Sequence, residues 1–281
     1  MAVTFDTLKP DARIFLELEK EPHWWKRFKE DSSLYIEIRK DNQVNVYYEG
    51  GSIARIHYCS KHKKLQVFTH HKYLGLPAPS KSSPYIECSG FIDSCLSDVL
   101  DRVMRVYSQK NSVNGIITKE NWSEKYIQGV MIAQSRQSYL DSEFAYNDDE
   151  ANNRIDIVKC EDGIITFVEL KRINDSRMLH ETDATPEVVF QMERYRHFIE
   201  KYSSKLLGYY KKLYSIKKSL GIPVPQCDTE VLQINKKPHL MICNTYSSMN
   251  KKRQKRVEEV VKILKDNSDI FTYEIKNTND I

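Results

Sequence analysis

The chain has 281 residues, of which 40% are hydrophobic and 29% are charged, with only nine glycines and nine prolines. These values exclude a long disordered or low-complexity protein and are typical of a globular chain with one large domain or two smaller ones. The net charge of +4 is compatible with a polyanionic partner but falls short of the strongly basic balance that by itself indicates nucleic-acid binding.

The cysteines and the apolar segments exclude further classes. None of the six cysteines belongs to a C-x-x-C pair, so neither a disulfide framework nor a zinc ribbon is indicated. No stretch reaches the roughly 18 uninterrupted apolar residues of a membrane helix. The opening residues also lack the basic and apolar regions of a secretory signal. We therefore expect a cytoplasmic protein that does not associate with a membrane.

The first part of the chain is expected to form an N-terminal β-rich domain over residues 1–80. After a short helical opening that ends in WWKRF, alternating residues predict four antiparallel strands: LYIEIRK, NQVNVYYE, SIARIHYCS and KLQVFTH. Short polar or glycine connections between them favour hairpins. The stretch LPAPSKSSP has no apolar period to bury, and it predicts a boundary before a second domain over residues 85–281.

The second domain is expected to be α/β with a mixed sheet, because helical and strand patterns alternate along it. Helices are predicted over 87–108 and over about 120–140, followed by the strands RIDIVK and IITFVELK. Thr185-Pro186 is typical of a helix start. It opens a helix through EVVFQMERYRHFIEKY, with a second helix over roughly 203–220. A strand (HLMICNT), a basic helix (251–266) and a final strand (FTYEIK) complete the chain.

The two strands RIDIVK and IITFVELK are expected to form a hairpin with a fixed register. Asp162-Gly163 predicts a two-residue type I′ turn, because both central positions of this turn need positive φ. Asp156 then lies directly across from Glu169, and Arg154 faces Lys171, whereas a longer turn would move this pairing. Alternation places four apolar residues on the other face of the hairpin: Ile155, Ile157, Val168 and Leu170.

Two carboxylates that face each other across strands destabilise a protein unless a proton or a cation lies between them. A divalent metal meets this need, with Asp156, Glu169 and the carbonyl of Leu170 as oxygen ligands for Mg²⁺ or Mn²⁺. Lys171 on the same face can orient or help deprotonate a water and offset charge on phosphorus oxygens. These groups suit phosphodiester hydrolysis. The alternative is an exposed hairpin end with ordinary solvated charges.

The segment NRIDIVKCEDGIITFVELK resembles the PD-(D/E)XK nuclease superfamily. Asp156 matches its acid, Glu169-Leu170-Lys171 matches its ExK element, and Ile155 stands where the superfamily name has proline. The resemblance covers about residues 120–202. It implies a restriction-endonuclease-like core and a divalent-metal-dependent nuclease that acts on nucleic acid, with DNA favoured over RNA. Duplex or single-stranded substrates, endo- or exonucleolytic cleavage and a homodimer all stay open.

Gln191 and Tyr195 resemble the QxxxY motif of the RecB-like branch of this superfamily. Residues four apart share a helix face, so both side chains can point toward the hairpin or toward a nucleic-acid backbone. Packing is the alternative role for Tyr195. The superfamily often adds an acid from the helix before the hairpin. Glu124 is the candidate, both as a catalytic group and as a metal ligand, and Glu143 is the alternative.

Basic residues in the second domain are candidates for phosphate contacts, although solvated helix faces would have the same composition. Tyr209, Tyr210 and Tyr214 lie among them and suit either base stacking or packing. Together with Tyr195, the candidate nucleic-acid contacts are Arg194, Lys211, Lys212, Lys251, Lys252 and Arg253.

Two other functions compete with a nuclease. The first is a catalytically inactive member of the same fold that binds nucleic acid or serves as a protein scaffold. The second is a metal-free adaptor whose N-terminal β-rich domain binds another protein. The complete set of Asp156, Glu169 and Lys171 favours the active enzyme.

Overall fold

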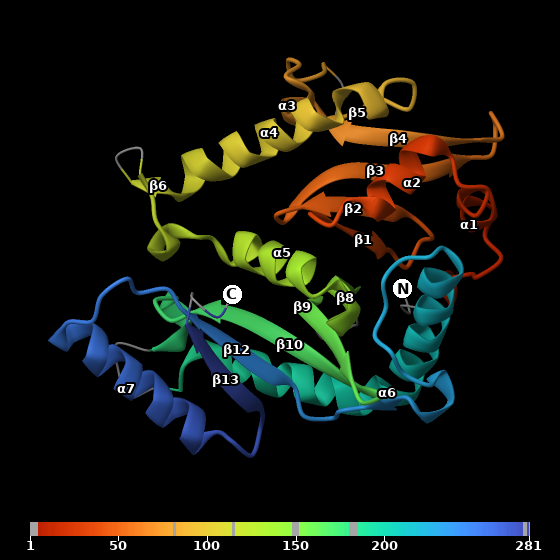
Figure 1. Ribbon diagram of the computed structural model, residues 1–281. Helices are drawn as coiled ribbons and strands as arrows, with labels where there is room; N and C mark the ends of the chain where they lie inside the picture. Colours follow the sequence, from red (N-terminus) through yellow and green to blue (C-terminus); the bar gives the residue numbers. More distant parts are fainter. Residues whose placement is uncertain are drawn as a thin grey trace.

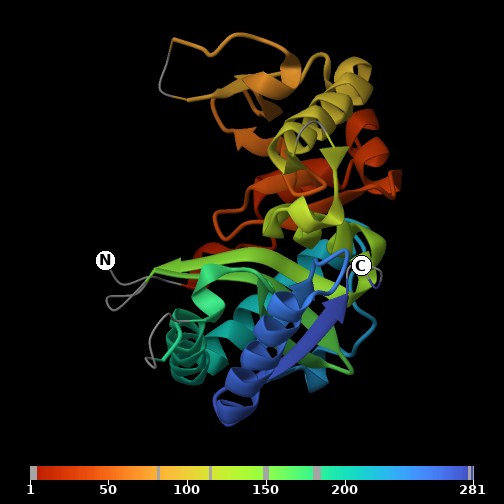
Figure 2. The same ribbon diagram turned by 90° about the vertical axis from the view of Figure 1, so that its left-hand side faces the viewer.

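The structure is a computed structural model that describes residues 5–80, 83–113, 116–147, 152–179, 185–277 and 280. Its described residues form a mixed α/β protein with two main sheets, one antiparallel and one mixed. Figures 1 and 2 show the N-terminal sheet above the second sheet, with helix α5 between them. No helix in these residues is both long enough and apolar enough to span a bilayer.

The N-terminal sheet contains the four predicted strands in the predicted antiparallel order. A short fifth strand pairs with β4 and extends this sheet past residue 80. The strands are β1 (Leu34–Ile38), β2 (Val44–Tyr48), β3 (Gly51–Cys59), β4 (Lys64–His70) and β5 (Tyr85–Glu87). Short helices accompany them: α1 (Arg13–Leu18), α2 (His23–Glu30) and α3 (His71–Leu74).

The segment that joins the two sheets departs from the predicted pattern. Helix α4 (Ile92–Asn111) is followed by the short pair β6 (Ser112–Val113) and β7 (Ile116–Ile117), and then by α5 (Glu124–Gln134). The helix predicted over 120–140 is too long, because a 3₁₀ turn follows α5 and Tyr139 begins a strand, β8 (Tyr139–Asn147).

The second sheet has the order β13-β12-β10-β9-β8. Antiparallel pairs join β8, β9 and β10, whereas β10, β12 and β13 run parallel. Its other strands are β9 (Asn152–Glu161), β10 (Ile164–Arg172), β12 (His239–Asn244) and β13 (Thr272–Asn277), with the short β11 (Gln233–Ile234) beside β10. The basic helix α7 (Lys251–Asp266) has the predicted bounds.

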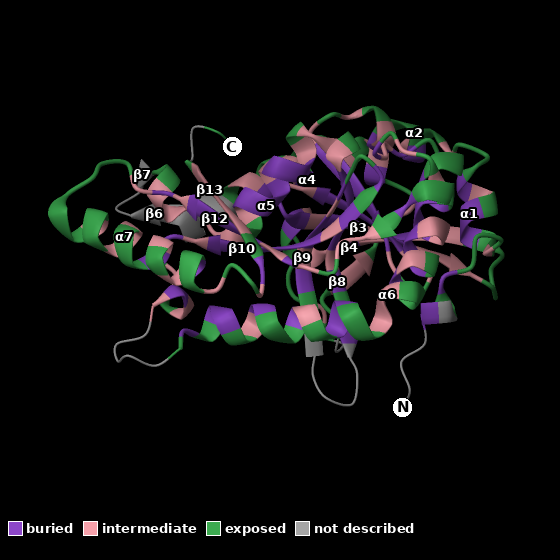
Figure 3. Ribbon diagram, turned by 90° about the horizontal axis from the view of Figure 1, so that it is seen from below, coloured by how far each residue is buried: buried purple, intermediate pink, exposed green. Residues whose placement is uncertain are grey.

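Helix α6 is one helix of 33 residues, Glu187–Ser219, and not the predicted two. It begins one residue later than expected, with Pro186 at its N-cap. The helix continues through Ser203 and Ser204 because its apolar stripe does, from Phe198 to Leu213. Figure 3 shows buried and exposed residues alternating along it. Tyr209, Tyr210 and Tyr214 are buried on this stripe, so they pack in the core.

Buried polar contacts join the two sheets. The Lys217 ammonium on α6 lies 2.8 Å from a carboxylate oxygen of Glu37 on β1 and donates to the Leu140 carbonyl on β8 at 2.7 Å. Arg39 contacts Asp141, with 3.5 Å between guanidinium and carboxylate. The main core cluster includes residues of both sheets. The division of the chain near residues 80–85 into two domains therefore stays a prediction.

Asp141 gives these contacts a predicted pH dependence. Burial, together with the nearby Glu37 carboxylate, raises the pKa of Asp141 to about 7, against the opposing effect of Arg39 and Lys217. The folded protein therefore keeps this proton at pH values where the unfolded chain has lost it. The stability that the proton contributes is present in full below the unfolded pKa and is lost as the pH rises toward 7.

We expect the Asp141→Asn variant to lose this pH dependence. The unfolding free energy of the variant minus that of the unchanged protein should be about 1–3 kcal/mol larger at about pH 8 than at about pH 5. Urea unfolding of both proteins at the two pH values measures the difference. An equal offset at both values would show that Asp141 does not hold a proton in the folded protein.

The α5 helix meets the turn between β2 and β3 in backbone contact. A Cβ atom added to Gly129 would lie 2.1 Å from the backbone nitrogen of Gly50, so only glycine fits there. This close approach fixes α5, which carries Glu124 and Gln128, against the N-terminal sheet.

Two glycine substitutions test this contact. The Gly129→Ala variant should lose about 1–3 kcal/mol of unfolding free energy, because overpacked backbone must move. The Gly208→Ala variant is the matched control on exposed α6 surface, where an added Cβ meets nothing within 4 Å. It should gain about 0.5–1 kcal/mol, the helix preference of alanine over glycine. Similar unfolding midpoints for the two variants would contradict the close contact.

Candidate active site

The hairpin of β9 and β10 has the predicted turn. Asp162 and Gly163 have φ values of 49° and 77°, as a type I′ turn requires. The register is also as predicted from Ile164 opposite Glu161 to Val168 opposite Ile157. This part of the expectation is confirmed.

The two strands separate beyond Ile157 and Val168, where the predicted register would place Asp156 opposite Glu169. From Val168 onward β10 pairs with β12 on its other side. The Asp156 carboxylate lies at the separation and accepts a hydrogen bond from the Leu170 amide at 3.0 Å. Asp156 is therefore joined to β10 by its side chain, and the expected cross-strand pairs Asp156–Glu169 and Arg154–Lys171 are absent from the described pairing.

The expectation that Ile155 shares a face with the other apolar residues of the hairpin is wrong. Ile157, Val168 and Leu170 share one core cluster with residues of α5, whereas Ile155 belongs to the other cluster, which includes the buried face of α6. Glu143 on the neighbouring strand has a φ of 51°, and no β8 residue pairs with Asp156. This local break in the ladder explains why alternation fails at Asp156.

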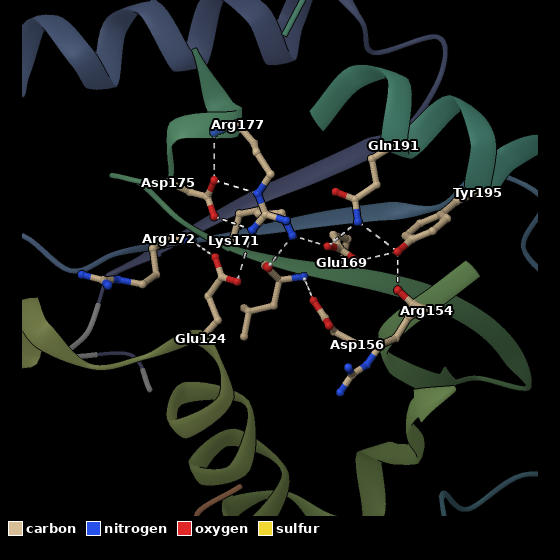
Figure 4. A network of polar contacts seen from close by, with 11 residues as sticks. Glu124, Arg154, Asp156, Glu169, Lys171, Arg172, Asp175, Arg177, Gln191 and Tyr195 are labelled. Atoms are coloured by element: carbon tan, nitrogen blue, oxygen red, sulfur yellow. Dashed lines mark hydrogen bonds and ion pairs between the residues drawn. The ribbon is translucent and has the colours of Figure 1, made fainter. Parts of the chain in front are cut away.

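Glu169 and Lys171 share a face, as predicted. Both are buried, with exposed fractions of 3% and 1%. The Lys171 ammonium contacts the Glu169 carboxylate and also lies 3.2 Å from the Leu170 carbonyl (Figure 4). They therefore form a buried ion pair, and the alternative of an exposed hairpin end does not describe them.

Gln191 and Tyr195 point from α6 onto Glu169, as Figure 4 shows. The Gln191 amide donates to one carboxylate oxygen of Glu169 at 2.6 Å, and the Tyr195 hydroxyl lies 3.1 Å from the other. Tyr195 also donates to the Arg154 carbonyl on β9. Because Tyr195 is only 2% exposed, it holds Glu169 in place and does not offer its ring to a nucleic acid.

The electrostatics of the site centre on Asp156. Burial and the neighbouring Glu169 carboxylate raise the pKa of Asp156 to about 7, while Lys171 and the Leu170 amide oppose this shift. Burial also raises the pKa of Tyr195, and Glu169 adds to the effect. A cation near Asp156 and Glu169 would relieve the repulsion between the two carboxylates.

Glu124 lies in the first turn of α5, where Ser123 caps the helix. Its carboxylate accepts a hydrogen bond from the Arg172 amide at 3.1 Å and lies 3.6 Å from the Arg177 guanidinium. Within the described part of the chain, no contact joins it to Asp156 or Glu169, although Lys171 is near enough to influence its pKa. Burial nevertheless raises the pKa of Glu124 above its ordinary value.

Glu143 does not lie on the helix before the hairpin, so the reason for considering it as the alternative acid is wrong. It belongs to β8, and its carboxylate lies 3.1 Å from the Lys125 ammonium and 2.9 Å from the Arg154 guanidinium.

Sequence reasoning missed Gln128, Asp175 and Arg177. Gln128 donates from α5 to the Asp156 carbonyl at 2.6 Å. Burial tends to raise the pKa of Asp175, but hydrogen bonds from Arg177 outweigh it and lower the pKa below its ordinary value. Asp175 also caps a short turn, a signal that the sequence NDSR carries. Gln128 had no such signal, because its role depends on the position of α5.

The predicted phosphate contacts lie in three places. Arg194 is exposed on α6, two turns after its start, and Lys211 and Lys212 are half-buried farther along the same helix. Lys251, Lys252 and Arg253 form the start of α7, where Arg253 pairs with Glu120 at 2.8 Å. A cavity of about 490 Å³ includes Lys252, Arg253 and Arg256. Arg256 donates to the carbonyls of Ile173 and Asp175, just past Lys171, so this basic surface adjoins the site.

Comparisons with protein-family models, curated proteins and solved structures found no match to this chain. Among the described residues, no group of three or more His, Cys, Asp or Glu side chains is arranged to hold a metal ion. A function for this chain is therefore inferred from the chemistry of the site alone.

Proposed function

We propose that this protein is a divalent-metal-dependent nuclease that hydrolyses phosphodiester bonds, with DNA favoured over RNA, on a restriction-endonuclease-like core. The observation that carries the proposal is the convergence of Asp156, Glu169 and Lys171 in a buried site, with Gln191 and Tyr195 fixing Glu169 from a second element. Two carboxylates, one ammonium and an amide donor that meet at one buried point, with a raised pKa at Asp156, are typical of a functional site.

The side chains present suit Mg²⁺ or Mn²⁺. Asp156, Glu169 and the Leu170 carbonyl offer only oxygen atoms, the ligands that hard cations prefer. Mg²⁺ commonly takes one or two carboxylates and completes its shell with waters and substrate phosphate. Two carboxylates therefore suffice, and Glu124 is at most an indirect ligand, since its carboxylate faces Arg172 and Arg177.

Each residue then has a definable task. A bound cation would neutralise phosphate charge and make a water more acidic. Lys171 would hold the attacking water or offset charge on the phosphorus oxygens. Gln191 and Tyr195 keep the Glu169 carboxylate oriented, and Gln128 keeps the β9 backbone at Asp156 in place. Basic residues at the start of α7 can bind flanking phosphates.

A second candidate function is a non-catalytic nucleic-acid-binding or scaffolding protein on the same core. One observation favours it: both carboxylate oxygens of Glu169 already have partners in Lys171, Gln191 and Tyr195. If no cation displaced the Lys171 ammonium, the Glu169 carboxylate would keep these partners and would not bind a metal.

Cleavage assays separate the two functions. The full chain and its Asp156→Asn variant are incubated with plasmid, single-stranded DNA and RNA, each with Mg²⁺, Mn²⁺ or a chelator. The nuclease should cut at least one substrate with a metal only, and the variant should be inactive. Absence of cleavage with every substrate would leave the non-catalytic function.

A further inference from the structure

A second candidate site lies between the N-terminal sheet and β8, away from the Asp156 centre. Two cavities of about 400 and 250 Å³ share the lining residues Tyr47, Arg55 and Glu143 and are therefore adjacent. We name them together the inter-sheet groove. Pockets of this size hold small organic ligands or a nucleotide. The site at Asp156, Glu169 and Lys171 does not account for this groove, because none of these three residues lines it.

The charge of the inter-sheet groove favours an anion. Six Lys or Arg side chains line it against three Asp or Glu side chains. Two of the three acidic side chains have basic partners, since Asp141 contacts Arg39 and Glu143 contacts Lys125 and Arg154. The third, Asp41, accepts a hydrogen bond from Gln43. The basic residues are Arg39, Lys40, Arg55, Lys72, Lys125 and Arg154.

The floor of the groove also carries polar atoms without partners. Asn45 is only 9% exposed, and its carbonyl oxygen has no hydrogen-bond partner in the described part of the chain. Arg55 lies directly opposite on β3, and its buried Nε–H lacks an acceptor there as well. An unsatisfied buried polar group costs about 1–3 kcal/mol. Both atoms are covered by neighbouring protein atoms in this conformation. A ligand that supplies one donor and one acceptor would remove both costs once the two side chains turn toward the groove.

Arg55 lies against an aromatic ring beside the groove. Its guanidinium lies 3.7 Å from the centre of the Tyr85 ring, and no carboxylate pairs with it in the described residues. The Tyr47 hydroxyl, beside Asn45, accepts a hydrogen bond from Arg39 at 2.6 Å. A donor and an acceptor that lack partners at the bottom of a basic groove match the edge of a nucleobase below its phosphate.

Arg154 joins the groove to the candidate active site. Its side chain lines the groove, and its carbonyl accepts the Tyr195 hydroxyl. Arg154 is two residues before Asp156 on β9, a spacing of about 7 Å along a strand. One nucleotide of an extended strand covers a similar length, so neighbouring nucleotides of one strand would reach both places.

We propose that the inter-sheet groove binds an unpaired nucleotide of a single DNA strand, with its phosphate on the basic rim and its base edge on Asn45 and Arg55. The connection to cleavage rests on the proposed function. A base can reach the floor only when its Watson–Crick edge is free, so the groove should discriminate against duplex DNA.

Binding by the full chain tests the groove separately from cleavage. Fluorescence anisotropy with a labelled short single-stranded DNA is measured in chelator, so that hydrolysis does not intervene. The Arg55→Met and Asn45→Leu variants should each bind about 5–30-fold more weakly, the effect of losing one buried polar contact. The Arg154→Met variant tests the basic rim and should also bind more weakly. Its side chain is 62% exposed, so its loss should not affect folding.

The control is Arg13→Met, which removes one exposed positive charge on α1, outside the groove. It should bind like the unchanged protein, and duplex DNA should bind more weakly than the single strand. Labelled RNA in a parallel titration shows whether the groove distinguishes the two sugars. Unchanged affinity in the Arg55 and Arg154 variants, or equal affinity for duplex, overturns the proposal. If the groove variants bind more weakly while the unchanged protein cleaves no substrate, the groove proposal is supported and the nuclease proposal is rejected.

Discussion

Replacing Lys171 with methionine is expected to abolish cleavage and to destabilise the protein. Lys171 is 1% exposed and its ammonium contacts the buried Glu169 carboxylate, so the variant leaves a buried charge without its partner. Such a change costs about 3–5 kcal/mol of unfolding free energy. The rate of phosphodiester hydrolysis should fall by at least about 100-fold, because the ammonium no longer offsets charge on the phosphate.

A double variant separates stability from catalysis. Glu169→Gln combined with Lys171→Met removes both charges, so urea unfolding should show most of the lost stability restored. Its cleavage rate should stay as low as that of the single variant. Because Glu169 is itself a proposed metal ligand, recovery of cleavage in the double variant would exclude both Glu169 and Lys171 from catalysis.

Replacing Asp156 with asparagine is expected to remove the thermal response of the protein to Mn²⁺. The unchanged protein should gain about 2–3 kcal/mol of stability at a metal concentration near 100 times the dissociation constant. The variant retains an acceptor for the Leu170 amide, whose nitrogen lies 3.0 Å from the carboxylate, but loses the charge that holds a cation. Differential scanning fluorimetry with and without Mn²⁺ measures the shift.

Asp141→Asn is the matched control for that experiment. Asp141 is also buried and its pKa is also raised to about 7, but its neighbours are Arg39 and Lys217. Its variant should keep the full response to Mn²⁺. A shift that persists in the Asp156 variant, or that disappears in the Asp141 variant, would place the metal elsewhere.

The hairpin could be predicted from the sequence because its signals are local. Asp162-Gly163 selects a turn type, the turn fixes the register, and the register joins the strands as far as Ile157 and Val168. The QxxxY spacing likewise placed Gln191 and Tyr195 on one helix face, and both reach Glu169. Each of these inferences needed only neighbours in the chain.

The missed features depend on contacts between distant segments. The separation of β9 from β10 at Asp156 accompanies a local irregularity in the neighbouring strand β8, where Glu143 has a positive φ. Strand β8 was hidden because Asp141, Ser142 and Glu143 interrupt its apolar alternation, yet the first two are buried by the N-terminal sheet and α6. The continuity of α6 comes from packing as well, since its two serines do not predict it.

The contacts of Glu124 and the inter-sheet groove could not be predicted from local sequence for the same reason. The sequence placed Glu124 on the correct helix, but only the fold shows its carboxylate at Arg172 and Arg177. The groove combines Asn45 and Arg55 from the first sheet with Arg154 from the second. No local pattern connects residues so far apart in the chain.

Diffraction from crystals soaked in Mn²⁺ tests the central claim most directly, because anomalous scattering locates the ion independently of activity. Our account predicts an anomalous peak in contact with the carboxylates of both Asp156 and Glu169, with the Lys171 ammonium displaced from its present contact. A fully loaded crystal in which Lys171 still pairs with Glu169 and the ion lies elsewhere would contradict it.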